Sequence, residues 1–117
     1  MRNKIIDLLG GSAYNYSEGN ATFTTPNLEG YTHLSIIIKV SGVSGTGSTF
    51  TFTESLDKDI YAEVKHSELT AGAVTIDSAE VVINMDYSPF IKKYIKINFN
   101  NNSETGTIDA ILVMPKA

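Results

Sequence analysis

Hydrophobic and polar residues alternate with a period of two along much of this 117-residue chain. In the first clear run, Leu34, Ile36 and Ile38 share one side of the expected strand, whereas Ser35 and Lys39 share the other. Strands with this pattern bury one face and expose the other, as in antiparallel sheets. The same pattern recurs at positions 49–53, 60–65, 81–86, 95–100 and 107–114.

The shared phase of these runs predicts which side chains form a single core. Most of them are β-branched or aromatic residues, which pack well on a pleated sheet. The predicted core consists of Leu34, Ile36, Ile38, Phe50, Phe52, Ile95, Ile97, Phe99, Ala110 and Leu112.

Short segments rich in Gly, Ser, Asn and Asp separate the runs and are typical of turns. A weaker strand pair is expected within residues 13–25, with Ser17 to Asn20 as its turn. We therefore count seven or eight strands. A single open sheet would leave one apolar face in water, so the fold class predicted is all-β, a single antiparallel β-sandwich of jelly-roll-like type.

The first twelve residues are predicted to form an N-terminal arm (1–12) ahead of a β-sandwich domain (13–117). Four large apolar side chains, Ile5, Ile6, Leu8 and Leu9, lie within five residues and precede a Gly-Gly-Ser joint. An isolated helical turn of this length is marginal in water, so we expect these four residues to contact a partner. The alternative is that they cap their own sandwich. Asp7 interrupts the apolar patch, which is too short for a secretory signal.

Composition narrows the classes of partner. The chain has no cysteine, which excludes disulfides and cysteine metal sites. Its formal net charge of -4 disfavours nucleic acid and anionic membranes as partners. The apolar run at positions 36–38 is far too short to span a bilayer. We expect no nucleic-acid partner and no membrane partner.

No group of residues predicts catalysis. His33 and His66 are the only histidines, and neither has a second ligand at metal spacing. The stretch "GVSGTGST" is rich in glycine but lacks the lysine and the helix of a phosphate-binding loop. The sequence therefore predicts no catalytic residue, no cofactor and no enzymatic activity.

Two charged clusters are candidate binding sites. The stretch "ESLDKDIYAE" gathers Glu54, Asp57, Asp59 and Glu63, but its spacing is not that of an EF-hand, so we predict no metal. Three lysines, Lys92, Lys93 and Lys96, surround Tyr94 and are interpreted as a solvated strand face in an acidic protein.

The order of features from Leu34 onward carries a resemblance. "LSIIIKVSGVSGTGSTFTFTESLDKDIYAEV" gives a hydrophobic strand, a Gly/Ser/Thr loop and an alternating strand, and "YIKINFNNNSETGTIDAILV" gives a final strand pair. The chain resembles small virion proteins of tailed bacteriophages, the β-sandwich proteins of the head that include decoration and auxiliary capsid proteins. The similarity covers the greater part of the chain.

The resemblance implies a structural protein that is assembled in the bacterial cytoplasm and located in the virion. Its implied partner is the major capsid protein or another virion protein, and it implies a homo-oligomer. The alternative is a carbohydrate-binding or cell-surface β-sandwich module, which would expose an aromatic platform. A small enzyme is the third reading, and it would need a deep polar pocket.

Overall fold

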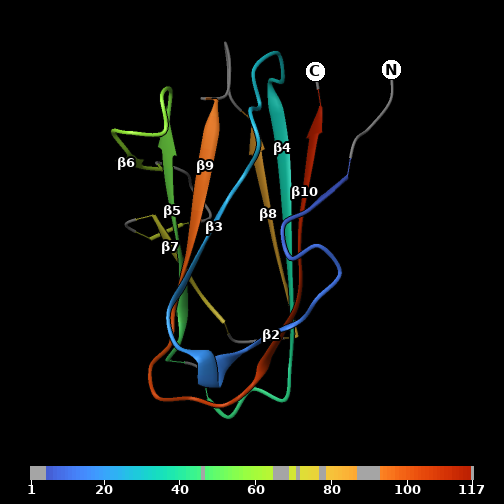
Figure 1. The fold of residues 1–117 in the computed structure, drawn as a ribbon, viewed down its shortest axis with the longest axis vertical. Helices are drawn as coiled ribbons and strands as arrows, with labels where there is room; N and C mark the ends of the chain where they lie inside the picture. Colours follow the sequence, from blue (N-terminus) through green and yellow to red (C-terminus); the bar gives the residue numbers. More distant parts are fainter. Residues whose placement is uncertain are drawn as a thin grey trace.

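The computed structural model describes residues 5–45, 47–64, 69–70, 72–76, 79–86 and 93–116. Within them, ten strands form two antiparallel sheets that lie face to face (Figure 1). Sheet A contains β1 (Ile6–Asp7), β2 (Tyr14–Asn15), β4 (His33–Ser41), β8 (Glu80–Asp86) and β10 (Thr107–Lys116). Sheet B contains β3 (Ala21–Thr24), β5 (Thr49–Ser55), β6 (Ala62–Glu63), β7 (Ala73–Thr75) and β9 (Tyr94–Asn100).

The strand order is that of a jelly roll. Sheet A runs β1–β10–β4–β8 with β2 also on β10, and sheet B runs β3–β9–β5–β6 with β7 also on β5. β1 and β2 behave as one interrupted strand on the edge of β10, and β6 and β7 do the same on β5. Counted this way the ten strands reduce to eight, the number in a jelly roll. The predicted all-β, antiparallel sandwich is confirmed.

The two short strands expected within residues 13–25 do form, but they do not pair with each other. β2 pairs with β10 in sheet A, whereas β3 pairs with β9 in sheet B. Between them, the 3-10 turn η1 (Tyr16–Glu18) carries the chain from one sheet to the other. Asn15 caps this turn by accepting a hydrogen bond from the N–H of Ser17 (2.9 Å).

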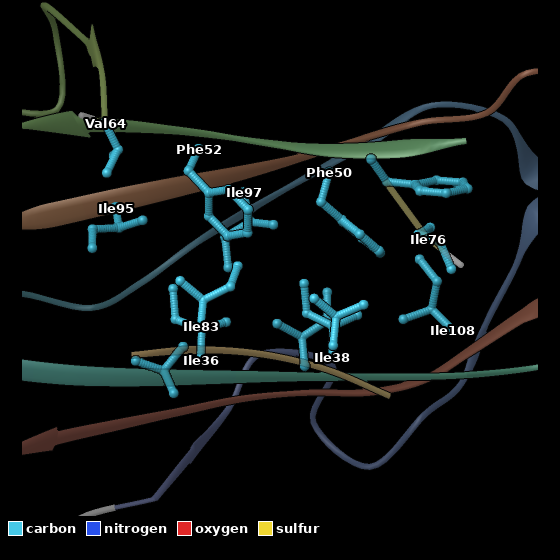
Figure 2. Close-up of a cluster of buried hydrophobic side chains, with 14 of the residues drawn as sticks. Ile36, Ile38, Phe50, Phe52, Val64, Ile76, Ile83, Ile95, Ile97 and Ile108 are labelled. Carbon is cyan, nitrogen blue, oxygen red and sulfur yellow. The ribbon is translucent and has the colours of Figure 1, made fainter. Parts of the chain in front are cut away.

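The core lies between the sheets, and its side chains come from both (Figure 2). Phe50 and Phe52 of β5 point from sheet B toward Ile36 and Ile38 of β4 in sheet A. All four are buried, as are the predicted core residues Leu34, Ile95, Ile97 and Phe99.

The predictions for Ala110 and Leu112 are wrong, and the cause is a β-bulge in β10. Ile108 pairs with Val40, but the next pair of the ladder is Ala110 with Lys39, so Asp109 is an extra residue. One extra residue shifts the side-chain phase of the strand beyond it. As a result Ile111, Val113 and Pro115 are buried in place of the predicted residues, which are only partly buried.

Candidate binding surface

β5 ends in a tight turn, residues 55–61, whose shape is fixed by two of its own side chains. The hydroxyl oxygen of Ser55 accepts hydrogen bonds from the N–H groups of Asp57 (3.2 Å) and Lys58 (3.1 Å). The Asp57 carboxylate accepts one from the Ser55 hydroxyl (2.9 Å) and one from the N–H of Asp59 (2.9 Å). Side-chain oxygens of Ser and Asp often replace strand partners in this way. We call this segment the 55–61 turn.

The same hydrogen bonds favour the ionised form of the Asp57 carboxyl. Hydrogen bonds from the N–H groups of Asp59 and Ile60, with a smaller effect from the Ser55 hydroxyl, lower the pKa of this carboxyl below its ordinary value. A carboxyl that accepts several hydrogen bonds favours its ionised form. The 55–61 turn therefore keeps its charged acceptor at neutral pH.

Two large aliphatic side chains on the 55–61 turn point into solvent. Leu56 is 56% exposed and Ile60 is 75% exposed. The alternation in the sequence had placed Ile60 in phase with Val64, which is buried, so the predicted strand phase fails at the turn. A contiguous exposed apolar patch can mark a protein–protein contact. Burying each one fully on a partner would contribute about 1.5–3 kcal/mol before ordering costs.

Two tyrosines and two lysines lie beside these aliphatic residues. Tyr94 of β9 is paired with Ser55, so it lies next to the turn. The Lys58 ammonium lies 4.9 Å from the centroid of the Tyr94 ring, and the Lys96 ammonium lies 3.8 Å from that of Tyr61. Both distances are those of cation–π contacts. One face of each ring is therefore already covered by an ammonium group.

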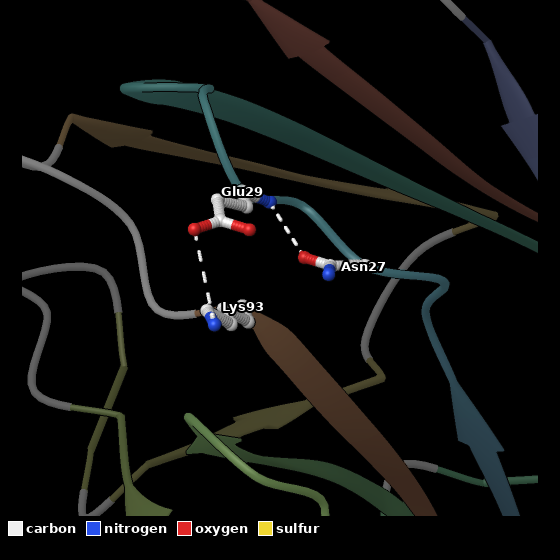
Figure 3. Close-up of polar contacts among 3 residues, drawn as sticks. All are labelled: Asn27, Glu29 and Lys93. Carbon is white, nitrogen blue, oxygen red and sulfur yellow. Dashed lines mark hydrogen bonds and ion pairs between the residues drawn. The ribbon is translucent and has the colours of Figure 1, made fainter.

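Two of the three lysines that the sequence analysis names, Lys93 and Lys96, contact other side chains of the same chain. The Lys93 ammonium lies 3.8 Å from a carboxylate oxygen of Glu29 (Figure 3). The backbone N–H of Glu29 donates to the side-chain oxygen of Asn27 (2.9 Å). Lys96 contacts the Tyr61 ring, and Lys92 lies outside the described residues. An exposed ion pair of this kind adds little stability, but it gives Lys93 an intramolecular partner.

The acidic residues of the predicted turn do not all lie in the turn. Glu54 is the last inward-facing residue of β5, and it is buried rather than part of the exposed turn. Asp57 and Asp59 lie in the turn. His33 is exposed, with its Nδ1 2.8 Å from the Thr32 hydroxyl, whereas His66 lies outside the described residues. The described residues contain no group of three His, Cys, Asp or Glu side chains placed to hold a metal.

The glycine-rich loop between β4 and β5 covers a polar cluster at the opposite end of the sandwich. The Ser48 hydroxyl lies 2.9 Å from Oε1 of Glu104 and 3.1 Å from Oδ1 of Asn101. A Cβ on Gly45 would lie 2.7 Å from Oε2 of Glu104, and one on Gly47 would overlap a neighbouring side chain. A side chain at Gly45 or Gly47 would displace the ends of the side chains that the loop backbone contacts. The described residues of the loop therefore pack against this polar cluster.

Tyr16 is buried in the core at this end of the sandwich. Its ring packs 4.6 Å from that of Phe99, and its backbone carbonyl accepts a hydrogen bond from Nδ2 of Asn101 (3.1 Å). Within the described residues, the Tyr16 hydroxyl has no hydrogen-bond partner. Burial, with a smaller effect from the nearby Glu104 charge, raises the pKa of Tyr16 to about 12. The neutral phenol is the form that fits this site.

The four residues predicted to contact a partner lie along the edge of β10. Ile6 is paired with Val113, and the N–H of Leu8 donates to the carbonyl of Ile111 (2.9 Å). Ile6, Leu8 and Leu9 are partly buried against the core, whereas Ile5 is 65% exposed. The intermolecular contact and the boundary at residue 12 stay predictions.

No model of a known protein family matches the chain, and no curated protein sequence matches it significantly. In the described part of the chain, no helix is long and apolar enough to cross a bilayer. Of the surface described above, the sequence had singled out only the lysines and the acidic residues. The signal for Leu56 and Ile60 was present, since both are aliphatic residues inside a polar turn segment.

Proposed function

We propose that the chain is a non-enzymatic structural protein of a tailed-phage particle, an auxiliary or decoration protein bound to the capsid through protein–protein contacts. The proposal is supported by the resemblance in the order of sequence features from Leu34 onward and by the jelly-roll strand order. Viral capsid domains and lectins both use this fold. The fold alone does not assign a function, so the proposal depends on the surface.

The observation that carries the proposal is the exposure of Leu56 and Ile60 on a turn held by its own hydrogen bonds. A preformed turn loses little conformational entropy on binding, so more of the burial energy of its side chains appears as affinity. Aliphatic anchors rimmed by Tyr and Lys match the anatomy of a protein interface, with an apolar centre and a polar rim.

The exposed start of the N-terminal segment offers a separate contact. Ile5 is 65% exposed and precedes β1, which pairs with β10 in sheet A. In Figure 1, the start of β1 and the loop between β5 and β6 lie on opposite sides of the sandwich. The partner we propose is the major capsid protein or another virion protein, contacted through the 55–61 turn, with Ile5 as a second contact.

The test is co-sedimentation of the purified chain with particles from the strain that encodes it. We expect the wild-type chain to sediment with particles, and the double variant Leu56→Ser, Ile60→Ser to lose most of this binding. Thr105→Ala is a matched control, because Thr105 is exposed and lies against the loop at the far end of β5. Equal binding of the double variant and the wild type would contradict the proposed surface.

A carbohydrate-binding module is the second candidate, and one observation favours it. The outer face of sheet B carries hydroxyl and amide groups in register, with the Thr22 hydroxyl 3.1 Å from Oδ1 of Asn98 and Nδ2 of Asn100 3.3 Å from the Thr51 hydroxyl. Such groups can hydrogen-bond to sugars. Binding of the chain to a glycan array, abolished by Asn98→Ala and retained by the Leu56→Ser, Ile60→Ser variant, would favour this candidate.

A further inference from the structure

Three polar side chains meet at the end of sheet B that the glycine-rich loop covers. Thr49 is paired with Asn100, so Ser48 and Asn101, one position further along each strand, face each other at the end of the β5–β9 ladder. Ser48 is fully buried, and its hydroxyl oxygen lies 3.1 Å from Oδ1 of Asn101. Oε1 of Glu104 lies 2.9 Å from the same hydroxyl oxygen. The structure therefore brings a hydroxyl, an amide and a carboxylate into contact.

The Ser48 hydroxyl has one hydrogen, but two acceptor oxygens lie within its reach. The carboxylate of Glu104 is the closer and the stronger acceptor, so the hydrogen points to Glu104. The N–H of Asn102 donates to the Ser48 oxygen (3.1 Å), which uses one of its two lone pairs. The other lone pair is left on the side of the Asn101 amide. A hydroxyl that donates to a carboxylate and faces an electrophilic carbon has the arrangement of a nucleophile with its base.

Three backbone groups fix the orientation of the Asn101 amide. Its Nδ2 donates to the carbonyl oxygens of Tyr16 (3.1 Å) and Glu104 (3.2 Å), so both of its hydrogens are used. Its Oδ1 accepts a hydrogen bond from the N–H of Glu104 (3.0 Å). This N–H polarises the amide C=O and would stabilise the negative charge that develops on Oδ1 when a nucleophile adds to the carbon.

The second carboxylate oxygen of Glu104 is the least satisfied polar atom of this cluster. Within the described residues, Oε2 is buried and has no hydrogen-bond partner. Buried polar atoms are almost always paired, and a catalytic role is one reason for an exception. A carboxylate in a site that is shielded from water can accept a proton from one group and return it to another.

We propose that Ser48 and Asn101 react to form an ester cross-link within the chain. The Ser48 oxygen attacks Cγ of Asn101 while the Glu104 carboxylate accepts the hydroxyl proton. The C–N bond of the amide then breaks, Glu104 returns the proton to Nδ2, and ammonia leaves. One O–H bond and one C–N bond are broken, and one C–O bond and one N–H bond are formed, so no oxidant, reductant or other reactant is needed.

The cross-link would join two residues that are 53 positions apart in the chain. A covalent bond that closes a long loop restricts the unfolded chain and so stabilises the folded one. The chain has no cysteine, and the ester would give it a covalent link that forms without an oxidising environment. The reaction occurs once per molecule, and the proposal does not depend on the role in a particle.

Intact-mass spectrometry of the purified chain tests for the cross-link. We expect the wild-type mass to be about 17 Da below the value calculated from the sequence, because one molecule of ammonia is lost. Ser48→Ala lacks the nucleophile and Glu104→Gln lacks the base, so both should have their full calculated masses. The matched control Thr105→Ala changes an exposed residue next to Glu104 and should show the same loss as the wild type. A wild-type chain at its full calculated mass would overturn the proposal, whether or not the variants fold.

A peptide map distinguishes the ester from a succinimide ring at Asn101, which also forms with loss of ammonia. Trypsin cleaves after lysine, so Ser48 and Asn101 lie on separate peptides, 40–58 and 97–116. In the wild type these two peptides should elute as one linked species, and hydroxylamine, which cleaves esters, should separate them. Loss of ammonia confined to a free peptide 97–116 would show that Asn101 has cyclised without Ser48, and the proposal would be wrong.

Discussion

Ile111 and Leu112 are adjacent, and the structure and the sequence pattern disagree about which of them belongs to the core. The simple alternation of 107–114 places Leu112 inward, whereas the bulge at Asp109 turns Ile111 inward. Replacing each residue with alanine therefore distinguishes the two accounts. We predict that Ile111→Ala is clearly the more damaging change.

The magnitudes follow from burial. Ile111 has no exposed surface, so its truncation should lower the free energy of unfolding by about 2–5 kcal/mol. Leu112 is partly exposed on the outer face, and removing the part of its side chain that is buried should cost roughly 1 kcal/mol. With a urea slope near 2 kcal/mol per M, a difference of about 2 kcal/mol separates the two unfolding midpoints by about 1 M.

Equilibrium urea unfolding of the wild type and both variants, at one protein concentration, measures these values. The slopes should agree, so that the midpoints can be compared directly. If Leu112→Ala unfolds at a lower urea concentration than Ile111→Ala, the bulge is misplaced and the original strand phase is correct.

Three further changes have defined outcomes. Burial raises the pKa of Tyr16 to about 12 from 10.0, so the neutral phenol contributes roughly 2–3 kcal/mol of stability that is full below pH 10 and lost as the pH rises through 12. Urea unfolding at about pH 8 and about pH 11.5 should show this loss of stability in the wild type but not in Tyr16→Phe. Equal losses of stability at the higher pH in both proteins would refute the prediction. Deleting residues 1–9 removes β1 and three partly buried side chains, and should lower stability by a few kcal/mol and weaken particle binding; unchanged binding would restrict this segment to its own sandwich. EDTA should leave the melting temperature unchanged, because the Asp57 carboxylate is engaged by its own turn; a fall that calcium reverses would reveal a bound metal.

The alternation predicted most of the core because each long strand has one face that is buried and carries apolar side chains. Phe50, Phe52, Ile95 and Ile97 are all buried as expected. The same reasoning cannot detect a bulge, because the extra residue at Asp109 is itself polar and fits the alternation. Only the pairing with β4 shows that it has no partner in the ladder.

Strand pairing was harder to predict than strand position. The segments around Tyr14 and Phe23 form strands, but their partners are β10 and β9, which lie far along the chain. A short polar segment between two strands has the same composition whether it closes a hairpin or crosses between sheets. The candidate surface does not follow from the pattern for a related reason. The alternation places Ile60 in a strand, and Leu56 lies in a segment that is expected to be a polar turn.

The measurement that tests the proposed function most directly is quantitative mass spectrometry of particles purified from the strain that encodes the chain. The account predicts that the chain remains with intact particles through density-gradient purification, at a fixed ratio to the most abundant structural protein. Recovery of the chain from the lysate but not from the purified particles would contradict the proposed function.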